Sequence, residues 1–167
     1  MNNFTVAVLV KNEFGVLNRV TSMFRRRRFN INSLTVCETE SPEVSRITVS
    51  SSGLETDKKQ LINQLYKLPD VFSIKELNIH ESVTCELMLI KVKNDAESRA
   101  DVRDAAAAFG AKVLDYTRES VTMRLTGTSR ELDAFTDLMR DYTILEICRT
   151  GIVSLERGAA TIRKMEL

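Results

Sequence analysis

The chain has 167 residues, of which 43% are hydrophobic and 28% charged, and its formal net charge at pH 7 is +1. This composition is typical of a folded globular protein with one ordinary domain or two small ones. It lacks the basic excess of a dedicated nucleic-acid binder, and no apolar run is long enough to span a bilayer. The first residues carry no signal-peptide pattern, so we expect a cytoplasmic protein without a membrane partner.

The sequence contains few side chains suited to metal or redox chemistry. Cys37, Cys85 and Cys148 are far apart and have no metal-ligand spacing, which favours buried free thiols in a reducing compartment. His80 is the only histidine and has no acid or cysteine placed to assist it. We therefore predict no metal site and no catalytic residues.

The first half of the chain alternates strand-like and helix-like patterns. Apolar residues on both faces of the first strand indicate a central position in a sheet, and the apolar stripe that follows has helical spacing. The expected elements are a strand at 4–10, a helix at 16–24, strands at 31–39 and 44–51, a helix at 61–68 and a strand at 71–79. Their order is β-α-β-β-α-β.

The second half repeats this order without repeating the sequence. Thr128 and Glu131 have the spacing of a capping box, and Gly110 follows an Ala-rich helix as its C′ residue. The expected elements are a strand at 87–92, a helix at 97–109, strands at 111–116 and 120–127, a helix after 128 and a strand at 144–155.

The fold class predicted from this order is α+β, with two tandem ferredoxin-like βαββαβ domains. We place the domains at 1–80 and 81–158, and expect 159–167 to be a flexible tail. In such a domain both helices pack on one face of the sheet. The other face requires a second sheet or an edge-paired subunit, so we expect oligomers.

The segment from Lys11 to Gly15 joins the first strand directly to the first helix. The first amides of a helix have no internal partners and carry the positive end of its dipole. Gly15 would allow a small anion to approach the backbone, and Asn12 adds a side-chain amide. This arrangement suits a carboxylate with an adjacent amine, as in an amino acid. The alternative is that Asn12 only caps the helix and Gly15 only makes the turn.

Four consecutive arginines, Arg25 to Arg28, follow at the end of this helix. Cations at that position complement the negative end of the helix dipole. The alternative is contact with a partner protein or with RNA, since the RNA-binding RRM domain has the same topology. That domain stacks bases on aromatic side chains of its central strands, and SRITVSSSG, the third strand here, has none.

An ordered series of stretches resembles the regulatory small subunits of acetolactate synthase, also called acetohydroxyacid synthase. The resemblance extends from about Phe4 to Gly158, and its first half is similar to an ACT domain. The stretches are NEFGVLNRVTSMFRRRRFNINSLTV, VSRITV, QLYKLPDVFSIKEL, ELMLIKV, LTGTSRELDAF and RTGIVSLERG.

This resemblance implies a non-catalytic subunit that binds no cofactor itself. The catalytic large subunit, its expected partner, would carry thiamine diphosphate, magnesium and FAD. The small subunit would activate that partner and impose feedback inhibition by a branched-chain amino acid, with valine favoured. The effector would lie between the ACT domains of a homodimer. By motif match one chain would supply Asn12, Gly15, Val16 and Leu17, and the other would supply Asn30 and Ile31.

Three positions depart from the family pattern. Lys11 replaces an acid, Phe14 replaces a small residue or proline, and Arg28 replaces a glycine in the turn after the first helix. A positive φ at Arg28 would cost roughly 1 kcal/mol. Two alternative functions remain: a stand-alone ACT-domain sensor that regulates another partner, and an RNA-binding protein that uses Arg25 to Arg28.

Overall fold

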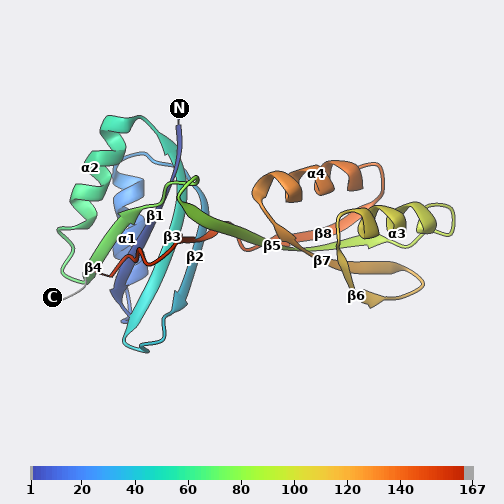
Figure 1. The fold of residues 1–167 in the computed structure, drawn as a ribbon, viewed down its shortest axis with the longest axis horizontal. Helices are drawn as coiled ribbons and strands as arrows, with labels where there is room; N and C mark the ends of the chain where they lie inside the picture. The colour runs from blue at the N-terminus through green and yellow to red at the C-terminus, as the bar shows by residue number, and fades with distance from the viewer. Residues whose placement is uncertain (1, 164–167) are drawn as a thin grey trace. The chain divides into compact units, whose positions relative to one another are not determined.

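The computed structural model describes residues 2–163, which form two compact units (Figure 1). Unit 1 contains the residues up to Thr84 together with those from Ile152 onward, and unit 2 is Cys85–Gly151. The division near residue 84 lies close to the expected boundary at residue 80. Residues 152–158, however, were expected in the second domain and belong to unit 1 instead.

Unit 1 has the order expected from the sequence. Its elements are β1 (Asn2–Lys11), α1 (Val16–Arg26), β2 (Ile31–Glu38), β3 (Val44–Gly53), α2 (Glu55–Leu65) and β4 (Val71–Glu76). The sheet order is β2-β3-β1-β4 with antiparallel neighbours, and both helices cover the same face (Figure 1). This is the ferredoxin-like arrangement.

The core of unit 1 lies between this sheet and its helices. Val6, Val8 and Val10 alternate onto the helix side of β1, where they pack with Val20 and Phe24 of α1. All five side chains are at most 2% exposed. Burial of such a stripe provides most of the stabilisation of an amphipathic helix, since its intrinsic propensity contributes little.

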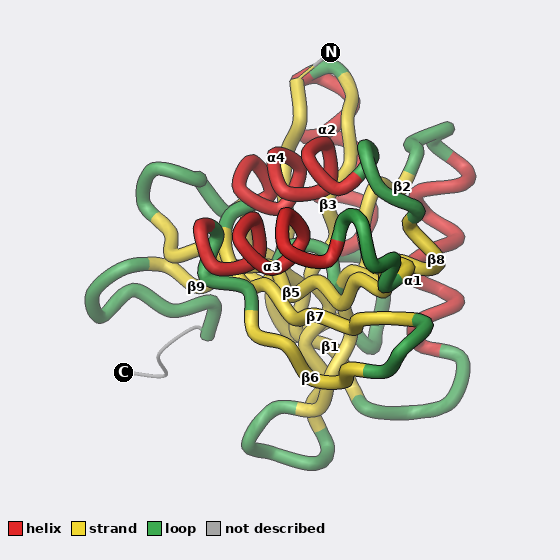
Figure 2. Tube along the Cα trace, turned by 90° about the vertical axis from the view of Figure 1, so that its right-hand side faces the viewer, coloured by secondary structure: helices red, strands yellow, loops and turns green. Residues whose placement is uncertain are grey.

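Unit 2 repeats the topology. Its elements are β5 (Ser82–Lys93, which starts in unit 1), α3 (Arg99–Ala108), β6 (Lys112–Tyr116), β7 (Ser120–Gly127), α4 (Ser129–Met139) and β8 (Ile144–Arg149). The strand order is β6-β7-β5-β8, and α3 and α4 lie side by side on one face (Figure 2). Thr128 and Glu131 form the predicted capping box, and Gly110 follows α3 with φ 65°.

The last predicted strand, 144–155, is interrupted. β8 ends at Arg149, Gly151 has φ 76°, and a separate strand, β9 (Val153–Glu156), pairs with β5. The left-handed backbone at Gly151 redirects the chain, because a strand cannot continue through that conformation.

Residues 152–163, termed here the C-terminal segment, lie on the face of the first sheet opposite the helices (Figure 1). Arg46 Nη2 donates to the Ser154 carbonyl at 2.7 Å, and Ser73 Oγ donates to the Ile162 carbonyl at 2.6 Å. Lys75 Nζ lies 2.8 Å from Glu156 Oε2. The chain itself therefore covers part of the face for which a second sheet or subunit was expected. The expected flexible tail is held as far as Arg163, and 164–167 lie outside the described residues.

The expectation of buried cysteines was wrong. Cys37, Cys85 and Cys148 are free thiols, and all three are exposed. Cys37 pairs across the sheet with Arg46, and Cys148 pairs with Leu89. These two cysteines therefore occupy the strand faces that point away from the helices. Among the described residues, no helix is long and apolar enough to cross a membrane.

Arg28 has φ 58°, a left-handed conformation in which a residue with a Cβ is strained. We expect Arg28→Gly to raise the free energy of unfolding by about 1 kcal/mol, because glycine lacks the Cβ that makes this backbone costly. Urea denaturation measures the change. Arg27→Gly is the matched control, since Arg27 has φ −96° and gains nothing from glycine. Equal effects of the two changes would refute the strain at Arg28.

Candidate functional site

The start of α1 is held in place by backbone bonds from the preceding loop. Lys11 N donates to the Asp70 carbonyl at 2.9 Å, and Asn12 N donates to the Glu43 carbonyl at 2.8 Å. Gly15 is the N-cap residue, with φ 82° and ψ −9°. A residue with a Cβ is strained in this conformation by roughly 1 kcal/mol, so glycine is the favoured residue at this turn.

No side chain caps this helix start. Val16 N donates to the Glu13 carbonyl at 3.3 Å, and Arg19 N donates to the Gly15 carbonyl at 3.0 Å. Within residues 2–163 the amides between them, those of Leu17 and Asn18, have no acceptor. These two N–H groups carry the positive end of the helix dipole and can receive an anion.

The side chain of Asn12 does not cap the helix, so the part of the alternative that gave it a capping role was wrong, whereas Gly15 does make the turn. Asn12 Nδ2 donates to Glu38 Oε1 at 2.9 Å and to the Pro42 carbonyl at 2.8 Å. Both amide hydrogens are therefore used within the chain, and Oδ1 remains as an acceptor. An acceptor beside an anion-binding helix start suits the ammonium group of an amino acid.

Arg19 is a candidate site residue that the sequence interpretation missed. Its Nε donates to Asp70 Oδ2 at 2.7 Å, and Asp70 is buried. A Cβ at Gly15 would lie 3.6 Å from Arg19 Nη1, so this part of the guanidinium borders the helix start. The pairing joins residues 51 apart. The only sequence signal was a cation one helical turn after the glycine.

The apolar residues of the predicted site differ in their availability. Val16 is 2% exposed and packs in the core, so only its backbone can face a ligand. Leu17 is 39% exposed, and Phe14 is fully exposed. Leu17 and Phe14 thus provide open apolar surface next to the uncapped amides, where the alkyl part of an effector could pack.

Asn30 and Ile31 lie at the other end of α1. Asn30 is exposed, its Nδ2 donates to Asn32 Oδ1 at 3.3 Å, and its carbonyl accepts from Ser51 Oγ at 2.7 Å. The 11 residues of α1 span about 16 Å at 1.5 Å per residue. A single chain therefore does not bring this pair to Gly15, and a site that uses both ends needs a second copy.

The arginine run also lies at the far end of α1 from Gly15. Arg25 and Arg26 occupy the last turn of the helix, and Arg27 is its C-cap residue. Arg27 Nη1 donates to Gln60 Oε1 at 3.2 Å, and all four arginines are exposed. Their position matches the expected complement to the negative end of the helix dipole.

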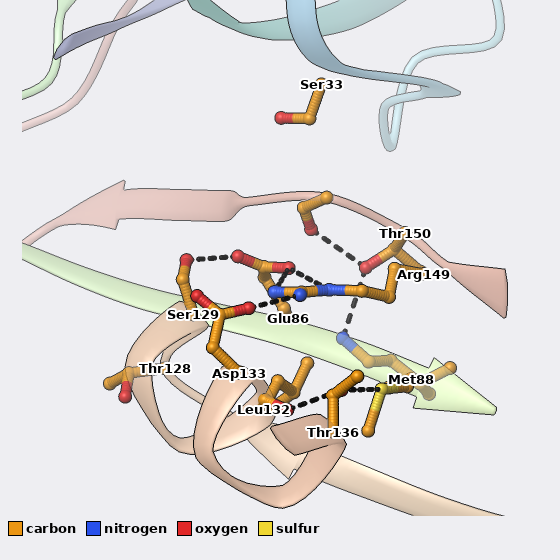
Figure 3. Close-up of polar contacts among 12 residues, drawn as sticks. Ser33, Glu86, Met88, Thr128, Ser129, Leu132, Asp133, Thr136, Arg149 and Thr150 are labelled. Carbon is orange, nitrogen blue, oxygen red and sulfur yellow. Dashed lines mark hydrogen bonds and ion pairs between the residues drawn. The ribbon is translucent and has the colours of Figure 1, made fainter. Parts of the chain in front are cut away.

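A second polar cluster joins β5, β8 and the start of α4 (Figure 3). Glu86, which is 5% exposed, accepts from Ser129 Oγ and from Arg149, whose Nε and Nη2 lie 3.1 and 2.7 Å from Oε2. Arg149 Nη1 donates to Asp133 Oδ1 at 2.5 Å. Burial alone would lower the pKa of Arg149, but the two carboxylates outweigh it and raise that pKa. We interpret this saturated cluster as a structural clamp.

The described residues contain no group of three His, Cys, Asp or Glu side chains that could hold a metal ion.

The comparisons with known proteins agree with the two-unit architecture. Residues 6–73 match the family model described as the AHAS small subunit-like ACT domain, and residues 85–158 match the one described as the small subunit of acetolactate synthase.

Relatives and a solved structure match nearly the whole chain. The acetolactate synthase small subunit of Mycolicibacterium smegmatis is 44% identical over 92% of this chain and 91% of its own length. The isozyme 3 small subunit of Escherichia coli is 39% identical over 95% and 98%. The crystal structure of the small subunit from Thermotoga maritima has a TM-score of 0.89 at 33% identity, covering 96% of this chain and 100% of that one.

The fold and these matches define an ACT-domain protein of the regulatory class. More specifically, the chain belongs to the family of acetolactate synthase small subunits, and it corresponds to the regulatory subunit rather than the catalytic one. Its partner is accordingly an acetolactate synthase catalytic subunit.

Proposed function

We propose that this chain activates an acetolactate synthase catalytic subunit in the cytoplasm and confers feedback inhibition by a branched-chain amino acid, with valine the first candidate. The observation that carries the proposal is the uncapped start of α1 at Gly15. The free amides and Arg19 can receive the carboxylate, Asn12 Oδ1 can receive the ammonium, and Leu17 offers apolar contact.

The proposed site is completed by a second copy of the chain. Asn30 and Ile31 follow the far end of α1, so a homodimer would place them against Gly15 of the other protomer. Lys11 and Phe14, the two departures beside the loop, are both exposed. They lie in the loop before the helix start, and their exposure is compatible with amino-acid binding there. Thiamine diphosphate, magnesium and FAD are assigned to the catalytic subunit.

The experiment is a reconstitution with the catalytic subunit from the same genome. We expect no acetolactate from pyruvate with the purified chain alone, even when all three cofactors are supplied. Addition of the chain to the catalytic subunit is expected to raise turnover and make it sensitive to valine. Feedback of this kind corresponds to a coupling free energy of about 1–3 kcal/mol.

Three outcomes would separate this proposal from its alternatives. Turnover by the isolated chain would contradict the regulatory assignment. Valine binding without co-purification of the catalytic subunit would favour a stand-alone sensor. Salt-sensitive retention of RNA on a filter, lost in an Arg26 and Arg27 double alanine variant, would favour the RNA-binding alternative.

A further inference from the structure

The C-terminal segment encloses a cavity of about 260 Å³ on the face of the first sheet opposite α1 and α2. Its floor includes Leu9, Arg46 and Cys37, which the strand register places in one row across β1, β3 and β2. Its roof includes Leu155 and Ile162 of the C-terminal segment. A cavity of this volume has room for a small ligand.

Most charged side chains around this cavity are already engaged within the chain. Glu38 accepts from Asn12, and Glu40 forms an ion pair with Arg163. Beside the cavity, Glu156 pairs with Lys75. Glu40 and Glu156 are thus paired with cations, whereas Glu38 is exposed and accepts from Asn12 through Oε1.

Arg46 differs from these residues. Its guanidinium donates to the Ser154 carbonyl, and within residues 2–163 it forms no ion pair at salt-bridge distance. Burial lowers the pKa of Arg46 against the opposing effect of Glu156. A guanidinium has five N–H donors, and a partly desolvated cation is stabilised by an anion with bidentate geometry. Arg46 also lines an adjoining hollow of about 400 Å³, but the apolar walls of Leu9 and Val153 belong to the smaller cavity.

We propose that this cavity binds a short aliphatic monocarboxylate, with its carboxylate on Arg46 and its alkyl chain against Leu9, Leu155 and Ile162. Because Arg46 has no ion pair within residues 2–163 while Glu40 and Glu156 are already paired with cations, the site suits a simple or 2-oxo carboxylic acid. This site lies on the opposite face of the sheet from the helices and is separate from the proposed amino-acid site at Gly15.

The test uses the full chain and 3-methylbutanoate as the probe. Cys37 borders the cavity, whereas Cys85 and Cys148 are exposed elsewhere, so the three thiols provide an internal comparison. We expect 3-methylbutanoate to slow the alkylation of Cys37 by iodoacetamide, measured by peptide mass spectrometry, and to leave the other two rates unchanged. The uncharged 3-methylbutanamide should give no protection, because the site requires the carboxylate.

Variants locate the binding. Arg46→Gln is expected to weaken calorimetric binding of 3-methylbutanoate about tenfold or more, whereas Arg163→Gln should retain it, since Arg163 is already paired with Glu40. If Arg46→Gln does not fold, Ile162→Trp fills the cavity from the C-terminal segment and should abolish Cys37 protection. Gly15→Asp should leave protection intact, which separates this proposal from the amino-acid site.

Three results would overturn the proposal. These are protection of Cys37 by the amide as well as the acid, no protection at millimolar 3-methylbutanoate, and loss of binding in Gly15→Asp but not in Arg46→Gln. The last result would assign the carboxylate to the helix start instead.

Discussion

Gly15→Asp is expected to weaken valine binding by about 100-fold or more while the fold persists. The new carboxylate would lie at the uncapped amides of α1 and within reach of Arg19, where the carboxylate of the effector belongs. One charge-assisted hydrogen bond is worth roughly 1.5–3 kcal/mol, and each 1.4 kcal/mol is a factor of ten in affinity. Calorimetric titration with valine measures the loss, and circular dichroism confirms the fold.

Gly15→Asn is the matched control for this change. Asparagine has the shape of aspartate and a similar tolerance of positive φ, but it carries no charge. It should weaken binding less than Gly15→Asp does. Asn30→Ala should also weaken binding, from across the dimer interface, whereas alanine at both Arg26 and Arg27 should not change it. If Gly15→Asp binds valine as the wild type does and the double arginine variant does not, the amino-acid site lies at the arginine end of α1 and not at Gly15.

Arg149→Met is expected to destabilise unit 2 by about 3–5 kcal/mol. Glu86 is 5% exposed, and Arg149 provides its paired N–H donors. Removal of one partner of a buried ion pair leaves the other charge buried and uncompensated. This costs more stability than replacing both partners, because the remaining charge stays desolvated. Urea unfolding, followed by a probe in unit 2, measures the change.

Arg140→Met is the control for Arg149→Met. Arg140 pairs with Asp137 at 3.0 Å, but both side chains are largely exposed, so its loss should cost less than about 1 kcal/mol. Adding Glu86→Gln to Arg149→Met should recover part of the stability, because the buried charge is then removed. Similar costs for Arg149→Met and Arg140→Met would show that Glu86 is solvated after all.

The sequence predicts those features that arise from local spacing. The capping box of Thr128 and Glu131 depends on residues three positions apart, and it is present. Gly15 was expected to make the turn into α1, and it has φ 82°, whereas the positive φ considered at Arg28 came from the family resemblance and is observed as φ 58°. The order of elements in both units likewise follows from hydrophobic periodicity.

Features that depend on contacts between distant residues could not be predicted in this way. Arg19 and Asp70 are far apart in sequence, so their pairing had no local signal. The C-terminal segment is held largely through its carbonyl groups, as at Ser154 and Ile162, and such bonds leave no periodic side-chain pattern. No sequence pattern therefore predicted that the C-terminal segment docks on the first sheet. The prediction of a single strand at 144–155 was wrong because the chain turns at Gly151.

The path of the chain has a consequence for the order in which the protein folds during synthesis. Unit 1 is discontinuous, so the covered face of its sheet is completed only after all of unit 2 has been made. Folding of unit 2 joins its own ends, because Thr150 N donates to the Leu87 carbonyl at 3.0 Å and Leu87 N donates to Thr150 Oγ1 at 3.1 Å. Closing a long loop costs entropy. A folded unit 2 has already met that cost and places residue 152 beside β5, so the residues that follow can then cover the open face of the first sheet.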